Sequence, residues 1–410
     1  MKVVVIGAGI VGVASALWAR RDGHEVVLVD REGPAAGASY GNGAVLARCS
    51  VVPVTTPGLM RRGLRMALDP SEPLFLRWAK LPGMAGWLAR YLSHANAADT
   101  ARIADGLAHV VADSVEQHEA LAAGTEAARY LAACDYAYVY ADRAAWEADA
   151  YGWGLRAAAG FVPEIVEGAA VREREPSLGP AAGLMAVLRE HGMVLDPGGY
   201  VAALAAQLER EGGTVRRAEV RDVTLEGGRV VAVETGEGPI PCDRVVVAAG
   251  AWSGPLMMRL GIDVPLAAER GYHLVWRAPE VRPSIPLMLA GAKFVATPVA
   301  AGLRCAGIVE LGGMDGARSR PALDLMRRRV RETFPGLTAE PDEAWLGFRP
   351  APSDSLPLIG EVRETGVIAA FGHHHVGLTA GPKTGRMVAD VIAGRRSNVD
   401  RAPFDPLRFV

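Results

Sequence analysis

Residues 2–30 read KVVVIGAGIVGVASALWARRDGHEVVLVD, and they determine how the chain begins to fold. A short apolar run precedes three glycines, Gly7, Gly9 and Gly12, and a helical stretch follows them. A second apolar run then ends in Asp30. The order of strand, glycine turn, helix and strand predicts the βαβ unit that opens a Rossmann-like fold.

Each glycine of this unit has a separate physical role. Gly7 makes a tight turn, Gly9 lets backbone N–H groups approach a pyrophosphate, and Gly12 lets the helix pack closely on the strand. The phosphates would lie at the positive end of the helix, and the carboxylate of Asp30 would accept hydrogen bonds from a ribose. A signal peptide is the alternative, but glycines have no role in its apolar segment. We therefore expect a dinucleotide to contact Gly7, Gly9, Ile10, Val11, Gly12 and Asp30.

The loop after Asp30 favours FAD over a nicotinamide cofactor. Residues 31–43 read REGPAAGASYGNG, and no further helix follows at the usual short spacing. A nicotinamide domain would continue with another strand and helix, whereas small residues suit a long cofactor that needs close backbone contacts. The predicted contacts are Arg31, Ser39, Asn42 and Gly43; an ordinary turn is the alternative for Ser39 and Asn42.

Length and composition limit the remaining possibilities. A chain of 410 residues is too long for a single core, and half of its residues are hydrophobic. The net charge of -2 gives no overall field that would attract nucleic acid. The four cysteines are far apart, which predicts a reducing compartment rather than a disulfide framework. We therefore expect a cytoplasmic protein, and its apolar runs are too short to span a bilayer.

The strand and helix patterns alternate between two kinds along the chain. Strand–helix signals return near residue 196 and near residue 343, while residues 264–311 alternate as in a β-sheet, and residues 100–134 suggest one long alanine-rich helix. We predict an α/β protein whose Rossmann-like FAD-binding domain is interleaved with an α+β substrate domain built on a mixed, largely antiparallel sheet. The predicted FAD-binding segments are 1–58, 196–262 and 343–410, and the substrate segments are 59–195 and 263–342.

Residues 58–92 combine a helical pattern with arginines and tryptophans. The pattern breaks at Pro70, Pro73 and Pro82. Two interpretations fit it: an amphipathic helix pair that covers a domain, or a helix that lies on the inner face of a membrane.

Two C-terminal runs carry the most specific pattern. GFRPAPSDSLPLIG at 347–360 delivers Arg349 into a proline-rich loop, and GHHHVGLTAGPKTGRMVADVI at 372–392 holds three adjacent histidines before a helix expected from about Pro382. With the N-terminal glycines, GASYGNGAV at 37–45 and VVVAAGAWS at 245–253, the whole chain resembles the D-amino-acid oxidase and dehydrogenase superfamily. Bacterial D-amino-acid dehydrogenase-like, glycine oxidase-like and hydroxyproline dehydrogenase-like enzymes are its most similar members.

The resemblance implies a role for several side chains. Arg349 matches the arginine that pairs with the substrate carboxylate, a structural ion pair being the alternative, and Tyr272 would form a second arm of the site. His373 matches a position where histidine is usual, whereas His374 and His375 depart from the family pattern, and one of them is expected to line the substrate site. No acidic or cysteine cluster accompanies the histidines, so no metal is expected. The implied FAD contacts are Val220, Ala249, Gly250, Trp252, Gly377, Leu378 and Thr379.

The implied reaction is FAD-dependent oxidative deamination of a D-amino acid, including cyclic ones such as D-proline or hydroxy-D-proline. The Cα hydride would pass to flavin N5, and oxygen or a quinone would accept the electrons. A glycine-, sarcosine- or other N-alkyl amino-acid oxidase is the alternative within this class. A nicotinamide-dependent dehydrogenase, or a flavin-binding subunit that needs a partner, represents the other classes. Residues 345–381 hold no cysteine, which predicts FAD bound without a covalent link.

Overall fold

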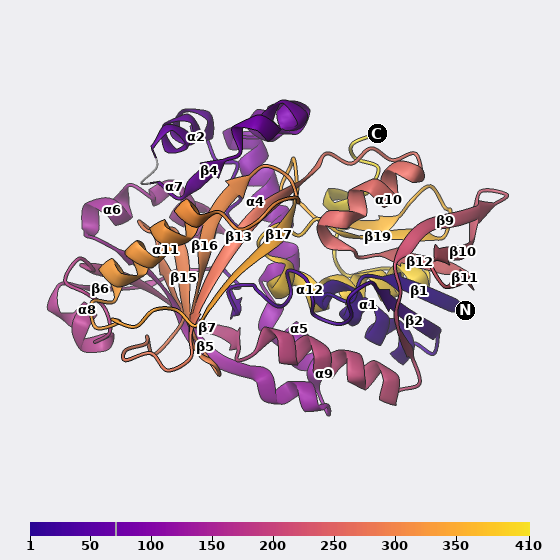
Figure 1. The fold of residues 1–410 in the computed structure, drawn as a ribbon, viewed down its shortest axis with the longest axis horizontal. Helices are drawn as coiled ribbons and strands as arrows, with labels where there is room; N and C mark the ends of the chain where they lie inside the picture. Colours follow the sequence, from indigo (N-terminus) through magenta and orange to yellow (C-terminus); the bar gives the residue numbers. More distant parts are fainter. Residues whose placement is uncertain (70–71) are drawn as a thin grey trace.

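The computed structural model describes residues 1–69 and 72–410, and two large sheets dominate it (Figure 1). The predicted helix break at Pro70 lies outside the described residues. The first sheet has six strands, which are parallel except for the antiparallel edge strand β18. Its strand order is β18 (Leu358–Glu361), β19 (Val367–Phe371), β12 (Arg244–Val247), β1 (Lys2–Ile6), β2 (Glu25–Asp30) and β8 (Thr214–Arg217).

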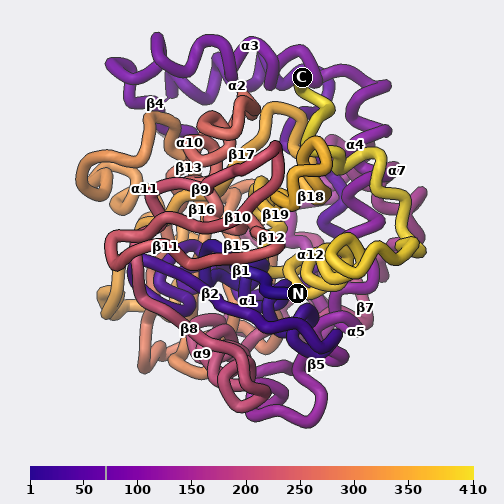
Figure 2. Tube along the Cα trace, turned by 90° about the vertical axis from the view of Figure 1, so that its right-hand side faces the viewer, coloured from indigo at the N-terminus to yellow at the C-terminus, as the bar shows by residue number. Residues whose placement is uncertain are grey.

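Two helices, α1 (Ile10–Arg21) and α12 (Gly377–Ile392), pack together on this sheet and share its largest core. Gly385 lies where they cross: a Cβ there would lie 2.6 Å from the carbonyl carbon of Ala14. The helix α9 (Pro197–Arg210) packs beside α1, and the side chain of Asp196 caps its first turn. The helices therefore hold the N-terminal and C-terminal parts of the chain side by side, as Figure 2 shows.

The second sheet is mixed and largely antiparallel. The helix α11 (Arg320–Thr333) lies over one face of this sheet (Figure 1) and packs apolar side chains against it, and the other face turns toward the first sheet. Its strand order is β17 (Glu343–Pro352), β13 (Leu266–Trp276), β16 (Gly302–Leu311), β15 (Phe294–Val299), β14 (Leu287–Leu289), β5 (Leu131–Tyr140), β7 (Leu184–Val194) and β3 (Val45–Leu46), with β4 (Leu74–Leu76) beside β16 and β6 (Glu164–Glu167) beside β7.

The remaining elements surround these sheets. A small antiparallel sheet contains β9 (Val220–Glu226), β10 (Arg229–Thr235) and β11 (Gly238–Pro241). The other helices are α2 (Leu59–Leu68), α3 (Ala85–Ser93), α4 (Ala97–Val111), α5 (Ser114–Ala122), α6 (Arg143–Glu147), α7 (Ala150–Ala158), α8 (Ala169–Arg174) and α10 (Ser253–Arg259), with short 3₁₀ helices η1 (Trp78–Met84), η2 (Glu126–Tyr130), η3 (Gly250–Trp252) and η4 (Ala402–Phe404).

The predicted fold class is confirmed: a mostly parallel sheet is interleaved along the chain with a mixed, largely antiparallel one. Two strands lie in a different sheet from the one that their predicted segment suggests. Both β3, in segment 1–58, and β17, in segment 343–410, belong to the ten-stranded sheet. The chain therefore crosses from one sheet to the other within these two segments. The residue bounds of the two domains stay a prediction.

The predicted single helix over residues 100–134 is wrong. The structure has two helices, α4 and α5, followed by η2 and by the strand β5, which starts at Leu131. Thr125 starts η2 because its side chain accepts a hydrogen bond from the backbone N–H of Ala127. Alanine favours helix locally, but pairing with β7 determines where the strand begins.

The C-terminal helix begins at Gly377, five residues before the predicted start at Pro382. Because proline has no N–H, Pro382 cannot donate to the carbonyl of Leu378 one turn earlier. The buried His118 contacts that carbonyl instead, with Nε2 2.9 Å from the oxygen, and its Nδ1 lies 2.9 Å from the hydroxyl of Tyr200. Burial lowers the pKa of His118 to about 4, which keeps the ring neutral at pH 7.

Adding one methyl group at the helix crossing tests this packing. Gly385→Ala should destabilise the protein by about 1–3 kcal/mol, because the new Cβ must push α1 away from α12. Gly154→Ala is a matched control, since that glycine lies in α7 with no atom within 4 Å of its added Cβ. Urea denaturation would measure both, and equal stabilities of the two variants would contradict the close packing.

Candidate active site

A cavity of about 1290 Å³ lies between the two large sheets. The glycine turn after β1, the end of β2 and the start of α12 form one side of it, and β13, β16 and β17 form the other. Its volume exceeds the 300–1000 Å³ that is usual for a single small ligand. The cavity is therefore large enough for a dinucleotide and a substrate together.

Nearly all the predicted cofactor contacts line this cavity. Gly12 is the exception and lies behind the wall, where it has the packing role expected of it. The residues that line it are Gly7, Gly9, Ile10, Val11, Asp30, Arg31, Ser39, Asn42, Gly43, Val220, Ala249, Gly250, Trp252, Gly377, Leu378 and Thr379.

The glycine turn has the shape of a phosphate cradle. Gly7 has a φ of +105°, and a Cβ at Gly12 would lie only 1.8 Å from the carbonyl oxygen of Gly7. Gly9 precedes α1 and has no side chain of its own to cap that helix. The backbone N–H of Ile10 donates to the hydroxyl of Ser39. The N-terminus of α1 thus presents backbone donors and a positive dipole to the cavity, which suits a pyrophosphate.

Asp30 holds the two loops of the cradle together. One carboxylate oxygen accepts from the N–H of Ala8 at 2.9 Å, and the other accepts from Glu32 at 2.8 Å and Gly33 at 2.9 Å. Its position at the end of β2 fits the expected ribose contact. Nearby, the guanidinium of Arg31 lies 4.1 Å from the ring centre of Trp252, and both residues belong to the cavity wall.

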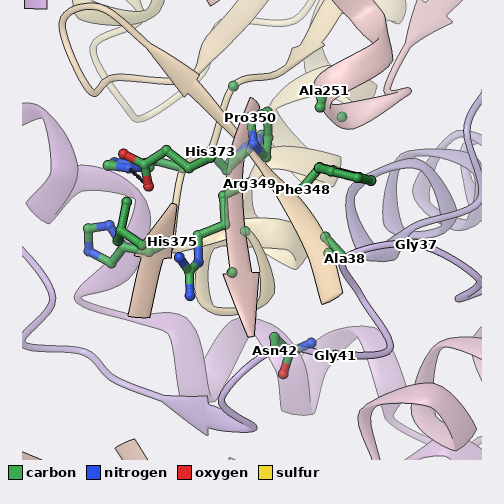
Figure 3. A pocket seen from close by; sticks show the side chains of 18 of the residues that line it. Gly37, Ala38, Gly41, Asn42, Ala251, Phe348, Arg349, Pro350, His373 and His375 are labelled. Atoms are coloured by element: carbon green, nitrogen blue, oxygen red, sulfur yellow. Dashed lines mark ion pairs between the residues drawn. The ribbon is translucent and has the colours of Figure 1, made fainter. Parts of the chain in front are cut away.

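Arg349 projects from β17 into the cavity (Figure 3). Its guanidinium lies over Gly271 of β13, where a Cβ would come within 2.5 Å of Cζ. Nη1 donates to the carbonyl of Ile308 at 3.2 Å, and Ile308 has a φ of +57° at an irregularity in the β13–β16 pairing. The glycine and the bulge therefore hold the guanidinium in place. Among the described protein atoms, its one hydrogen bond is the bond from Nη1 to the carbonyl of Ile308.

The three adjacent histidines have three different environments. His373 is buried, with Nε2 2.8 Å from the hydroxyl of Thr384. His374 has a φ of +49°, and its Nε2 lies 2.8 Å from a carboxylate oxygen of Glu269. His375 lines the cavity near Arg349 (Figure 3), and its side chain is exposed there. Within residues 1–69 and 72–410, no three histidine, cysteine or acidic side chains are grouped as metal ligands.

Tyr272 lies on the other face of the sheet from the cavity. It is buried under α11, where its hydroxyl donates to Glu310 and accepts from the N–H of Ser319. Side chains alternate along β13, so Glu269 and Gly271 face the cavity instead. The structure therefore places no arm of the cavity at Tyr272.

Glu269 is the cavity residue that the sequence analysis missed. It is 4% exposed and lies directly opposite Arg349 in the β13–β17 pairing. Burial alone would raise the pKa of Glu269, but His374, Arg349 and His375 together lower it below its usual range. A single acid in the apolar strand LAAERGYHLVW was the available signal, because a buried carboxylate requires partners.

Residues 58–69 and 72–92 cover the cavity at the end near Glu269. Trp87 and Tyr91 of α3 stack with ring centres 4.6 Å apart, and the indole N–H of Trp87 donates to the carbonyl of Ala351. The helix α2 lines the cavity too, but none of its residues is buried. A covering role, one of the two interpretations of this segment, is therefore what the packing shows.

Comparison with known proteins identifies the family. Residues 2–391 match the DAO family model, described as FAD dependent oxidoreductase. The chain belongs to this family. The D-amino-acid oxidase of Bradyrhizobium diazoefficiens is 37% identical over 100% of this chain and 99% of its own length. The D-amino acid dehydrogenase of Sinorhizobium medicae is 29% identical over the whole of both chains.

Solved structures confirm the fold of this FAD-dependent oxidoreductase. Glycine oxidase from Geobacillus kaustophilus superposes with a TM-score of 0.76 at 20% identity, over 100% of this chain and 99% of its own. L-proline dehydrogenase from P. horikoshii gives a TM-score of 0.74 at 19% identity, over 100% and 97%. The expected cofactor, FAD, is thus confirmed, and the glycine cradle fits its pyrophosphate. Among the described helices, none has the length and hydrophobicity needed to cross a bilayer.

The position of Asp30 predicts a measurable loss of FAD binding. Asp30→Ala removes the acceptor for three backbone N–H groups and the expected acceptor for the ribose, so FAD should bind about 1–3 kcal/mol more weakly. Asp30→Asn retains one oxygen acceptor without charge and should lose less. Titration of the apoprotein with FAD would measure both, and an unchanged dissociation constant in Asp30→Ala would contradict this role.

Proposed function

We propose that this protein catalyses the FAD-dependent oxidation of a D-amino acid at Cα, to an imino acid that hydrolyses to an oxo acid. The observation that carries the proposal is the guanidinium of Arg349, which lies in the same cavity as the predicted FAD contacts and, among the residues that the structure describes, donates to one backbone carbonyl. A guanidinium fork binds a planar carboxylate through two parallel hydrogen bonds. The D-amino-acid oxidase and dehydrogenase relatives support the choice of substrate class.

The protein's part in the reaction is to bind and orient the substrate. Arg349 would hold the carboxylate and so fix the Cα–H bond relative to the cofactor. When bound, FAD supplies the acceptor for the hydride. The N–H groups of Gly377, Leu378 and Thr379 open α12 at the cavity wall, where the helix dipole favours negative charge on a neighbouring group.

We propose that FAD is bound without a covalent link to cysteine. The four cysteines are Cys49, Cys134, Cys242 and Cys305, and none of them is among the residues that line the cavity. Burial also raises the pKa of each thiol, to about 11 for Cys49 and about 12 for Cys134 and Cys242, which disfavours the thiolate that would attack a flavin.

Variants of Arg349 test the proposed function. The assay is anaerobic bleaching of the flavin by a panel of D-amino acids, first with the wild type and then with each variant. Arg349→Lys should lose part of the catalytic efficiency, because lysine retains the charge without the fork. Arg349→Met should lose about 100-fold or more, because it retains neither. The apparent substrate affinity and the rate of flavin reduction should both fall, while the FAD content stays near that of the wild type.

Arg328→Met provides a matched control, because Arg328 is an exposed arginine of α11 on the far face of the sheet. This control should leave flavin reduction unchanged. Reduction of Arg349→Met at the wild-type rate would mean that another residue holds the carboxylate. A wild-type enzyme that reacts only with glycine or N-alkyl amino acids would instead favour the glycine- or sarcosine-oxidase alternative.

We also propose that a membrane quinone reoxidises the flavin and that α2 contacts the bilayer. Met60, Leu64 and Leu68 form one face of α2 at four-residue spacing and are 69%, 63% and 68% exposed. The same helix carries three arginines and no acid, which suits an anionic lipid surface. Figure 2 shows α2 and α3 together along one edge of the molecule, and α2 lines the cavity mouth. Oxygen is the alternative acceptor.

Lipid vesicles test the membrane contact. The protein should co-sediment with mixed phosphatidylcholine–phosphatidylglycerol vesicles, and the double variant Leu64→Gln, Leu68→Gln should bind about 10-fold less, since two large side chains no longer enter the bilayer. Val162→Gln is the control, because Val162 is 76% exposed elsewhere on the surface. Rapid reoxidation of the reduced flavin by oxygen, without vesicle binding, would favour an oxidase instead.

A further inference from the structure

The buried pair of Glu269 and His374 has no role in the function proposed so far. Both side chains belong to the cavity wall, with side-chain exposures of 6% and 2%. Glu269 lies directly opposite Arg349 on the neighbouring strand, yet its carboxylate pairs with His374, and the guanidinium turns over Gly271 to Ile308. A cation and an anion thus stand beside each other in the cavity without forming an ion pair within 4 Å.

We infer that Glu269 binds the amino group of the substrate and accepts a proton from it. In this inference His374 positions the carboxylate of Glu269. This inference rests on the proposed function, in which Arg349 binds the substrate carboxylate. Residues directly opposite on paired strands have Cα atoms about 5 Å apart, and an amino acid carries its two charged groups on one carbon. The two side chains together therefore match the two ends of a zwitterion.

The proposed step balances as a simple proton transfer. An N–H bond of the substrate ammonium breaks, and the proton moves to a carboxylate oxygen of Glu269. The nitrogen retains the electron pair, which forms the C=N bond as hydride leaves Cα for FAD, the two-electron oxidant of the proposed reaction. Without such an acceptor, the ammonium has no electron pair to assist the departing hydride.

The groups that face Glu269 come from three elements. Arg349 lies on β17, His374 and His375 precede α12, and Tyr91 approaches from α3. Burial and the nearby Glu269 raise the pKa of Tyr91 well above its usual range, so this phenol stays neutral. The carboxylate of Glu269 is therefore ionised at neutral pH, which is the charge state that can pair with an ammonium group and accept a proton from it.

A buried ion pair on the opposite face of the same sheet shows how a purely structural pair is built. Arg270 donates to Glu310 and to the carbonyls of Asp315 and Ala317, and Tyr272 also donates to Glu310. The Glu269–His374 pair is not saturated in this way. Nδ1 of His374 is buried with no hydrogen-bond partner among the described protein atoms, and its backbone has a φ of +49°. Such strain is typical of functional positions.

Ligand binding separates the two ends of the proposed zwitterion site. Glu269→Gln should bind D-alanine or D-proline about 10- to 100-fold more weakly, the scale of one lost charge-assisted hydrogen bond. Propionate and cyclopentanecarboxylate lack the amino group, so their affinity should stay within a few-fold of the wild type. Arg349→Met should lose both kinds of ligand. Perturbation of the flavin spectrum of the holoenzyme would report binding.

The pH dependence of flavin reduction separates proton transfer from a structural role. In Glu269→Gln the substrate must lose its proton to solvent first, so the rate should be low at neutral pH and recover toward the wild type at alkaline pH. Glu269→Asp should restore part of the neutral-pH rate. In His374→Asn the acidic limb of the pH profile should move to higher pH than in the wild type, because loss of the imidazole raises the pKa of Glu269.

Glu310→Gln is the matched control, a buried acid of the neighbouring strand on the other face. It should lower stability without moving the pH profile. If Glu269→Gln retains the FAD content, affinity and pH profile of the wild type, the inference is overturned. It is also overturned if that variant stays slow at every pH with normal amino-acid affinity. If the wild type is bleached by no amino acid, the proposed function itself fails, which is a distinguishable result.

Discussion

The contact between Gly12 and the carbonyl of Gly7 is the constraint on which the cofactor side of the molecule depends. It brings α1 against β1 so closely that no side chain fits between them, and this closeness directs the first N–H groups of α1 into the cavity. Asp30 then fixes the loop after β2 to the same turn. The second helix that faces the cofactor, α12, packs across α1 through Gly385. The cradle is therefore a product of backbone proximity at three glycines.

The substrate side uses glycine differently. Gly271 and Gly347 lie opposite each other on β13 and β17, and they leave a gap in an otherwise filled sheet surface. Arg349 folds over Gly271, while Trp345 folds over Gly347 and stacks on His273 at 5.1 Å between ring centres. Missing side chains thus determine where the charged and aromatic groups of the cavity point. The bulge at Ile308 then supplies the carbonyl that holds the guanidinium.

Nearly all the residues that the sequence predicted as cofactor contacts line the cavity, because the signals there are local. The glycine spacing, the acid at the end of β2 and the small-residue turns each specify their own backbone geometry. On the opposite wall of the cavity the structure departs more from the sequence-based expectation, since the side chains there are placed by strand register. The one-residue alternation of β13 turns Glu269 into the cavity and Tyr272 into the core. The early start of α12 was missed because His118, more than 250 residues away, compensates for the proline.

That compensation also makes the cofactor end of α12 a point of acid sensitivity. His118 is neutral in the folded protein with a pKa of about 4, below the 6.5 of an unfolded histidine. Between these two values the unfolded chain binds the extra proton, so stability falls as the pH drops from about 6.5 toward 4. A protonated ring could no longer accept from the hydroxyl of Tyr200, and the strain would arise beside Leu378, in the first turn of α12, which lines the cavity. Mild acid would therefore weaken the packing at the start of α12.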